Sequence, residues 1–196
     1  MNIKSLVIAG VAAVVLSPTA NASFITFTDR AAWETAVNGT FSQETFDSPS
    51  PTGFTIEQVG SGHSIGISDG VLYDRTVLDT TYSDYHFDTL INAFGANWDL
   101  RPGDAGQGLQ LFAGGNIITP EIANDYSGGF FGLVSTTAFN LVSVHSGSYS
   151  GFAETYGVDN VVFALAVPEP ESYILMLAGL GLIGSIARRR KAKQDR

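Results

Sequence analysis

The sequence predicts a mainly β protein, with a single β-sandwich or jelly-roll-like domain that contains one short N-terminal helix. Two observations predict this fold class. Short runs rich in Phe, Val, Ile and Thr recur along the chain, and Gly, Asn, Asp or Pro separates each run from the next. Helical periodicity, by contrast, is confined to one stretch near residue 30. Short strands with regular turn signals are typical of all-β sandwiches.

The stretch TDRAAWETAV predicts the helix. Thr28 or Asp29 can cap its first turn, and Asn38-Gly39 ends it. Its apolar residues recur at helical spacing, so we expect one side to be buried, comprising Ala32, Trp33, Ala36 and Val37.

The predicted strands follow in the segments GFTIEQV, SIGISDGVLYD, TLINAFGANWDL, GLQLFAGGNIIT, FFGLVS, AFNLVSVHSG and VDNVVFALAV. Asp69-Gly70 and Gly114-Gly115 fall between apolar runs. Because tight hairpin turns need residues that tolerate positive φ, both dipeptides predict hairpins.

Charge excludes one class of partner. Between residues 23 and 167 the chain has three arginines and no lysine against sixteen carboxylates, a net charge of −13. Binding to nucleic acid requires cationic side chains for the phosphates, so no nucleic acid partner is expected. The chain also has no cysteine, so the domain must be held by its core and not by disulfides.

Residues 1–22 predict a secretory signal peptide. An early Lys4 precedes an apolar run that ends at Leu16, and Pro18 and small residues follow. The run is shorter than the roughly 20 residues that a membrane-spanning helix needs. We expect the general secretion machinery to export the chain and signal peptidase to cut between Ala22 and Ser23, leaving residues 23–167 as the ectodomain.

Residues 168–196 form a tail with three parts. It begins with Pro168, Glu169 and Pro170, continues as an apolar segment over residues 173–187, and ends in a basic cluster over residues 188–196 that includes Arg188, Arg189 and Arg190. The apolar segment predicts a short transmembrane helix, which the arginines can extend by snorkelling. Cations favour the cytoplasmic side, so the ectodomain should lie across the membrane.

These three parts, in this order, resemble the PEP-CTERM sorting signal of Gram-negative bacteria. The resemblance implies an exosortase as partner, an anchor in the inner membrane before processing, and delivery to the cell surface or the exopolysaccharide matrix of a biofilm. The body also resembles a recurrent β-rich ectodomain found ahead of such tails, in segments such as AFGANWDL and ETYGVDNVVFALAVPEP. That second resemblance implies fold and location without implying an activity.

Catalytic motifs have little support. The stretch from Gly62 to Gly66 matches the G-x-S-x-G pattern, which would make Ser64 the nucleophile of a hydrolase. That pattern needs a helix after the serine, whereas ISDGVLYD predicts strand and turn. His63, His86 and His145 follow no metal-ligand spacing. The sequence therefore favours a protein that is not an enzyme, with a hydrolase as the weaker reading.

Two binding hypotheses remain open beside a purely structural role. Calcium prefers carboxylate and carbonyl oxygens, and it could join the first and last strands of a jelly roll through Glu44, Asp47, Asp159 and Asn160. Solvated acids at strand edges are the alternative, and melting curves with calcium and with chelator would decide. A lectin-like carbohydrate-binding module would instead stack sugars on exposed aromatics, for which the candidates are Tyr82, Tyr85, Trp98, Tyr126 and Tyr149. For Trp98 we expect a place in the buried core rather than a stacking role.

Overall fold

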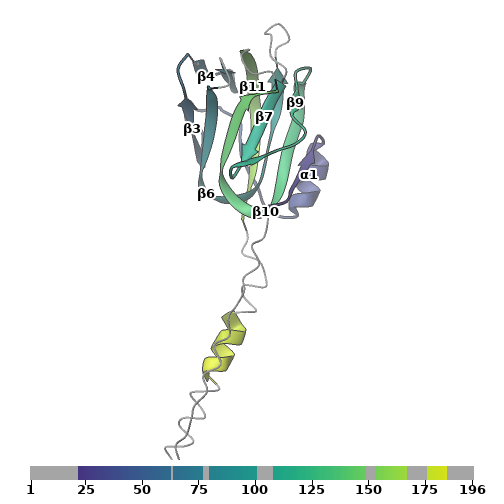
Figure 1. Ribbon diagram of the computed structural model, residues 1–196, viewed down its shortest axis with the longest axis vertical. Coiled ribbons are helices and arrows are strands. Elements are labelled where there is room, and N and C mark those ends of the chain that lie inside the picture. The colour runs from purple at the N-terminus through teal and green to yellow at the C-terminus, as the bar shows by residue number, and fades with distance from the viewer. Residues whose placement is uncertain are drawn as a thin grey trace, which may run out of the picture.

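The computed structural model describes residues 22–62, 64–76, 80–100, 108–148, 153–166 and 176–184. Strands dominate it, and Figure 1 shows their arrangement. In chain order the elements are β1 (Phe24–Phe27), α1 (Arg30–Val37), β2 (Ser42–Glu44), β3 (Phe54–Val59), β4 (Ser64–Ser68), β5 (Val71–Thr76), β6 (Tyr82–Leu100), β7 (Gly108–Ala113), β8 (Asn116–Ile117), β9 (Ile122–Ala123), β10 (Ser127–Ser146) and β11 (Glu154–Leu165).

Hydrogen bonds link the strands into one antiparallel sheet, in the order β4-β5-β11-β6-β10-β7-β8. This sheet folds over itself because β6 and β10 run through two layers. The start of β6 and the end of β10 pair with β3 and β7, and we call this layer the β3 sheet. The end of β6 and the start of β10 pair with β11 and β1, and this layer, which also contains β2, β4 and β5, is the β11 sheet.

The two long strands change layer at exposed corners. In β6 the corner is at residues 88–90, three consecutive exposed positions that follow the alternating stretch 82–87. In β10 the pairing with β6 shifts register between Val134 and Phe139. Irregularities of this kind bend a strand and increase its twist, which lets the same strand serve both faces of the core.

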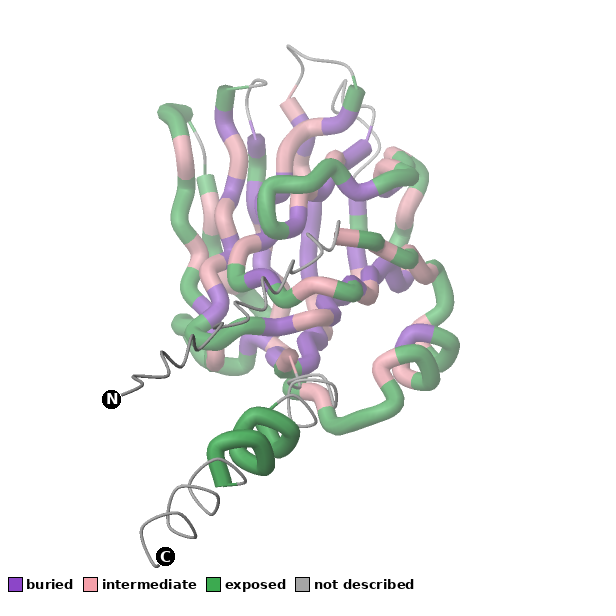
Figure 2. Tube along the Cα trace, turned by 60° about the horizontal axis from the view of Figure 1, so that its bottom comes forward, coloured by how far each residue is buried: buried purple, intermediate pink, exposed green. Residues whose placement is uncertain are grey.

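The core lies between the two sheets, where buried residues gather (Figure 2). Phe54 of the β3 sheet lies 6.0 Å, ring to ring, from Phe163 of the β11 sheet, and Phe87 lies 5.1 Å from Phe163. Tyr85 and Phe94 face each other across the bend of β6 at 6.2 Å. Aromatic pairs of this geometry stabilise a core beyond the area that they bury, so large rings hold the layers together.

A second, smaller core lies on the outer face of the β11 sheet, under α1. Asp29 caps the helix by accepting a hydrogen bond from the Ala32 amide, and Asn38 ends it in a left-handed conformation. Trp33 is fully buried there, against a patch of small and apolar residues, and its Nε1 donates to the Leu133 carbonyl at 3.0 Å. One half of this outer face is thereby covered by the helix.

Several predictions from the sequence are confirmed. The protein is mainly β, the helix and both of its caps lie where the sequence placed them, and Asp69-Gly70 and Gly114-Gly115 form turns with positive φ. The expected buried face of the helix is partly wrong, since Ala32 and Ala36 are exposed. The helix has only two turns and contacts the sheet through Trp33, with Val37 one turn later on the same side.

The tail is described in part. Residues 176–184 form a helix whose positions are all exposed. Within the described ranges, no helix is both long and apolar enough to cross a membrane. The predicted transmembrane helix over residues 173–187 therefore stays a prediction. The signal peptide before Ala22, the Pro168-Glu169-Pro170 motif and the basic cluster lie outside the described residues.

Candidate functional site

The outer face of the β11 sheet has two halves with different character. Where α1 covers it, the outward residues are small or apolar: Ala93, Gly95, Phe130, Gly132, Val162 and Ala164. Further along the same strands, α1 no longer covers the sheet and the outward residues become polar. This uncovered half contains a groove of about 320 Å³, a volume at the lower end of the range for small-molecule sites.

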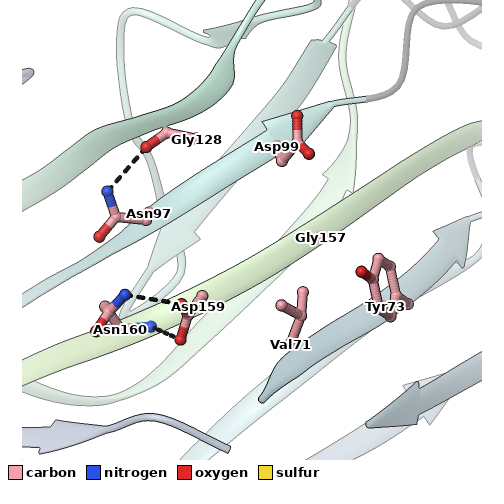
Figure 3. Close-up of a pocket in the computed structure, with 8 residues that line it drawn as sticks. All are labelled: Val71, Tyr73, Asn97, Asp99, Gly128, Gly157, Asp159 and Asn160. Atoms are coloured by element: carbon pink, nitrogen blue, oxygen red, sulfur yellow. Dashed lines mark hydrogen bonds between the residues drawn. The ribbon is translucent and has the colours of Figure 1, made fainter. Parts of the chain in front are cut away.

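Four neighbouring strands line the groove (Figure 3). β5, β6 and β11 contribute side chains that alternate with core residues, because successive residues of a strand point to opposite faces. The lining residues are Val71 and Tyr73 of β5, Gly157, Asp159 and Asn160 of β11, Asn97 and Asp99 of β6, and Gly128 of β10.

The strand register places Gly157 at the centre. It pairs with Tyr73 on one side and with Asp99 on the other, so these three residues form one row across the sheet. In the next row Asp159 pairs with Asn97. A glycine between two strands leaves a gap in the layer of side chains, and this gap forms the floor of the groove.

A β-bulge in β11 turns two consecutive residues toward the groove. The pairing of β11 with β6 shifts between Asp159 and Val162, and Asn160 has φ of 51°, in the left-handed region. A bulge inserts one residue and re-aims its side chain, which is why Asp159 and Asn160 both line the groove. The Asn160 side-chain amide donates to Asp159 Oδ2 at 2.8 Å, and Asn160 Oδ1 accepts from Gln43 Nε2 at 2.8 Å.

A buried polar cluster lies directly beneath the groove, on the core side of the same strands. Asp74 is 1% exposed, and its Oδ2 accepts hydrogen bonds from Ser83 Oγ and, at 2.6 Å, from Tyr156 Oη. Burial raises the pKa of Tyr156 well above its usual value, and the nearby Tyr85 and Asp74 raise it further. The Tyr156 phenol therefore stays protonated at neutral pH and donates a hydrogen bond to Asp74. The hydrogen bonds to Asp74 link β5, β6 and β11.

The structure places Glu44 on the strand next to that of Asp159 and Asn160, because β2 pairs with β11 at Glu44 and Val161. Asp47 follows β2 in a loop. The oxygens of these predicted calcium ligands have other partners, however. Glu44 accepts from the amides of Phe46 and Thr52, and Asp47 accepts from the Thr45 hydroxyl. Among the described residues, no group of three or more His, Cys, Asp or Glu side chains is arranged to hold a metal. The calcium hypothesis stays a prediction.

Ser64 opens strand β4 and is exposed. The strand leads through the Asp69-Gly70 turn into β5, so a hairpin follows the serine where a nucleophile elbow requires a helix. His63, which precedes it, lies outside the described residues.

The aromatic candidates for sugar binding are scattered. Tyr85 is fully buried, so its prediction as an exposed stacking residue is wrong, whereas the burial of Trp98 confirms its expected place in the core. Alternation along β6 turns both side chains inward. The Tyr82 ring stacks on His145 at 4.2 Å, on the outer face of the β3 sheet. Tyr126 lines a second depression of about 300 Å³ beside β10, and Tyr149 lies outside the described residues.

The sequence pointed to Asp159 and Asn160 but not to the other six groove residues, among which Tyr73 and Gly157 carry a partial sequence signal. The sequence contains part of the signal for each of these two residues. In VLYDRT, Tyr73 follows the core residue Leu72, so alternation alone places Tyr73 on the outer face. A glycine inside the apolar run after Tyr156 is unusual for a strand and often marks the close approach of a ligand. What the sequence does not show is that the two residues pair with each other.

Comparison with curated proteins returned no match. Solved structures with similar architecture include a mutant of the family 29 carbohydrate binding module CBM29-2, which aligns with 67% of this chain and 99% of its own at 8% identity and a TM-score of 0.48. A low affinity xylan binding module from Roseburia intestinalis aligns over 65% and 97%, at 12% identity and a TM-score of 0.41. The catalytic unit of an α-1,3-glucanase from Streptomyces thermodiastaticus aligns over 66% and 27%, at 14% identity and a TM-score of 0.36.

A protein-family model matches the tail. It describes the PEP-CTERM protein-sorting motif and covers residues 166–191, which include all of the predicted apolar segment and the first four residues of the basic cluster. The chain therefore carries a PEP-CTERM sorting motif, which indicates an exported protein that an exosortase sorts.

Proposed function

We propose that this protein is a non-enzymatic component of the cell surface or of the exopolysaccharide matrix, and that an exosortase processes it at its tail. The observation that carries the proposal is where the sorting motif begins. It starts at residue 166, directly after β11 ends at Leu165. The Ala166 amide donates to the Leu90 carbonyl at 3.0 Å, so the sandwich holds the chain up to the first residue of the motif.

Cleavage within the motif would thus leave every strand of the sandwich intact. Pro168 and Pro170 lack backbone N–H groups and disfavour regular pairing, which keeps this stretch accessible to an enzyme. Before cleavage, residues 173–187 would hold the protein in the inner membrane and the arginines at 188–190 would remain on the cytoplasmic side. After cleavage, the acidic sandwich would be released to the surface or the matrix.

Carbohydrate binding is the second candidate function. The groove on the β11 sheet favours it, because it offers an aromatic ring, carboxylates and amides on a surface that α1 leaves open. This second function is compatible with the first, since a matrix protein that contacts polysaccharide would be retained in the matrix.

Replacing Pro168, Glu169 and Pro170 together by alanine tests the main proposal. We expect this variant to stay at full length in the membrane fraction, because the exosortase would no longer recognise its substrate. The matched control replaces Pro49 and Pro51, two prolines of a loop in the sandwich, and should be processed like the wild type. Release of the triple variant at the wild-type length would contradict the proposal.

A further inference from the structure

The floor of the groove is kept free by a glycine that the strand itself does not need. Gly157 is a mid-strand residue whose φ lies outside the left-handed region, so an L-residue could occupy its backbone conformation. Glycine weakens a strand relative to other residues, since it has more freedom to lose and no side chain to pack. A Cβ atom here would lie 3.2 Å from Val71 Cγ1 and 3.5 Å from Tyr73 Cε1, inside the groove. Because Gly157 has no Cβ atom, this part of the groove stays open.

Tyr73 forms the aromatic part of the groove. It is half-buried, and its ring edge lies next to the position that a side chain at Gly157 would fill. A ring that leans over a glycine of the neighbouring strand rests on the sheet and keeps part of its surface in solvent. An exposed aromatic surface of this kind binds the apolar C–H face of a ring-shaped ligand.

The polar groups around this ring are held in place before any ligand binds. Asn97 donates from its side-chain amide to the Gly128 carbonyl at 2.9 Å, and in Figure 3 its amide oxygen turns away from Gly128. Asp159 accepts from the backbone and side-chain amides of Asn160. Groups that are fixed in advance lose little entropy on binding.

A hydrogen bond from Gln43 also holds the bulge of β11 in place. Gln43 accepts from Arg30 Nη2 at 2.8 Å and donates to Asn160, so α1 is linked to the groove by two hydrogen bonds. The side chains of Asp159 and Asn160 therefore approach a ligand in one arrangement.

The charge of the groove restricts the ligand. Asp99 and Asp159 are its ionisable side chains apart from Tyr73, and none of the eight lining residues is basic. Arg75 points to the same face two residues beyond Tyr73, outside the lining. The surrounding sequence is strongly acidic. An anionic ligand would be repelled, whereas hydroxyl groups can donate to carboxylates and exchange hydrogen bonds with amides.

We propose that this groove binds an uncharged polysaccharide, with one sugar ring against Tyr73 and its hydroxyls bonded to Asp99, Asn97 and Asp159. The groove crosses β5, β11, β6 and β10, three strand spacings or about 14 Å. The inference deepens the second candidate function, and it rests on the first for the presence of polysaccharide around the protein.

The test is affinity electrophoresis of the full-length protein in mild detergent, through gels that contain one polysaccharide each. The neutral probes are a mixed-linkage β-glucan, xylan and galactomannan, and alginate is the acidic probe. We expect retardation by at least one neutral probe and none by alginate. No retardation by any neutral probe, or retardation by alginate alone, would overturn the proposal.

Two substitutions locate the binding. Gly157→Val fills the floor and Tyr73→Ala removes the ring, and each should weaken binding by about tenfold or more. Thr55→Val is the matched control, because it also places a valine in a strand but at an exposed position of β3, in the other layer. Denaturant unfolding shows whether each variant is folded, and Tyr73→Ala decides the matter if Gly157→Val is not. Unchanged binding in a folded Tyr73→Ala variant would overturn the site.

This experiment uses unprocessed protein, so its outcome does not depend on the exosortase. A failure of binding would leave the sorting proposal standing, and a failure of processing would leave the saccharide site standing.

Discussion

Glu44 lies at the end of β2, where its side chain is only 7% exposed. Its Oε1 accepts from the Phe46 amide at 2.7 Å and its Oε2 from the Thr52 amide at 2.6 Å. Phe46, which supplies the first of these amides, adopts φ of 53°, a rare conformation for a bulky residue. Its ring enters the core next to Phe54. The carboxylate therefore holds a strained turn in place, in the position where the sequence suggested a calcium ligand.

Replacing Glu44 by Gln should destabilise the protein. Glutamine keeps one acceptor oxygen but presents an NH2 group to the second backbone amide, so one charged hydrogen bond is lost and its donor is left buried. Hydrogen bonds to charged groups contribute about 1.5–3 kcal/mol each, and we expect the free energy of unfolding in urea to fall by about 2 kcal/mol. The control Asp47→Asn, at an exposed site, should stay within about 0.5 kcal/mol of the wild type. An equally small effect at Glu44 would show that the carboxylate is not a brace.

His145 should make the free energy of unfolding depend on pH. Its ring lies between Tyr82 at 4.2 Å and Phe112 at 4.7 Å. Burial of the imidazole lowers the pKa of His145, and the nearby Asp84 acts in the opposite direction but more weakly. The unfolded chain, where histidine titrates near about 6.5, therefore takes up this proton at a higher pH than the folded protein. Stability from this residue is present above that pH and is lost as the pH falls through it.

The variant His145→Gln should accordingly show a smaller loss of unfolding free energy between about pH 7.5 and pH 5 than the wild type. Tyr82→Leu opens one side of the ring stack and should also reduce the loss, because it exposes the imidazole. Urea unfolding at a series of pH values measures both effects. Slopes identical to that of the wild type in both variants would contradict a depressed pKa.

At the scale of elements, α1 depends on its N-cap residue and on one anchor. Asp29 satisfies an amide of the first turn, and Trp33 buries the helix against the β11 sheet. We expect Asp29→Ala to lower the free energy of unfolding by about 1 kcal/mol, and Asp29→Asn to restore most of it, since asparagine caps helices equally well. Urea denaturation of the two variants measures the difference. If alanine and asparagine destabilise equally, the effect of Asp29 is not capping.

The helix was predictable because its signals are local: a capping residue, an apolar pair one turn apart and an Asn-Gly end. The two hairpin turns were predictable for the same reason. The long strands were not, because FFGLVS and AFNLVSVHSG read as two strands yet form one continuous β10 that bends at a corner. Propensity does not distinguish a bend within a strand from a turn between strands.

The groove could not be predicted from the sequence for a related reason. Tyr73, Asn97 and Gly157 are far apart in sequence, and only the pairing of β5, β11 and β6 makes them neighbours. The Asp159-Asn160 pair lies within the predicted strand VDNVVFALAV, and the sequence does not show that this strand has a bulge there.

At the scale of the whole molecule, two strands that cross between layers join the sandwich into one unit, and its last strand leads directly into the sorting motif. The motif itself was predictable from the sequence, since its proline pair, apolar segment and arginine cluster are contiguous. The acidic surface is compatible with an exported protein and unsuited to anionic partners. We propose above all that the tail sorts the sandwich and is then removed.

The most direct test is the intact mass of the protein. It would be measured in membrane and extracellular fractions of a host with and without its exosortase. We predict that only the host with the enzyme yields a product that begins near Ser23 and ends near Pro170, and that this product leaves the membrane fraction. A chain that keeps its full tail in both hosts would contradict the claim.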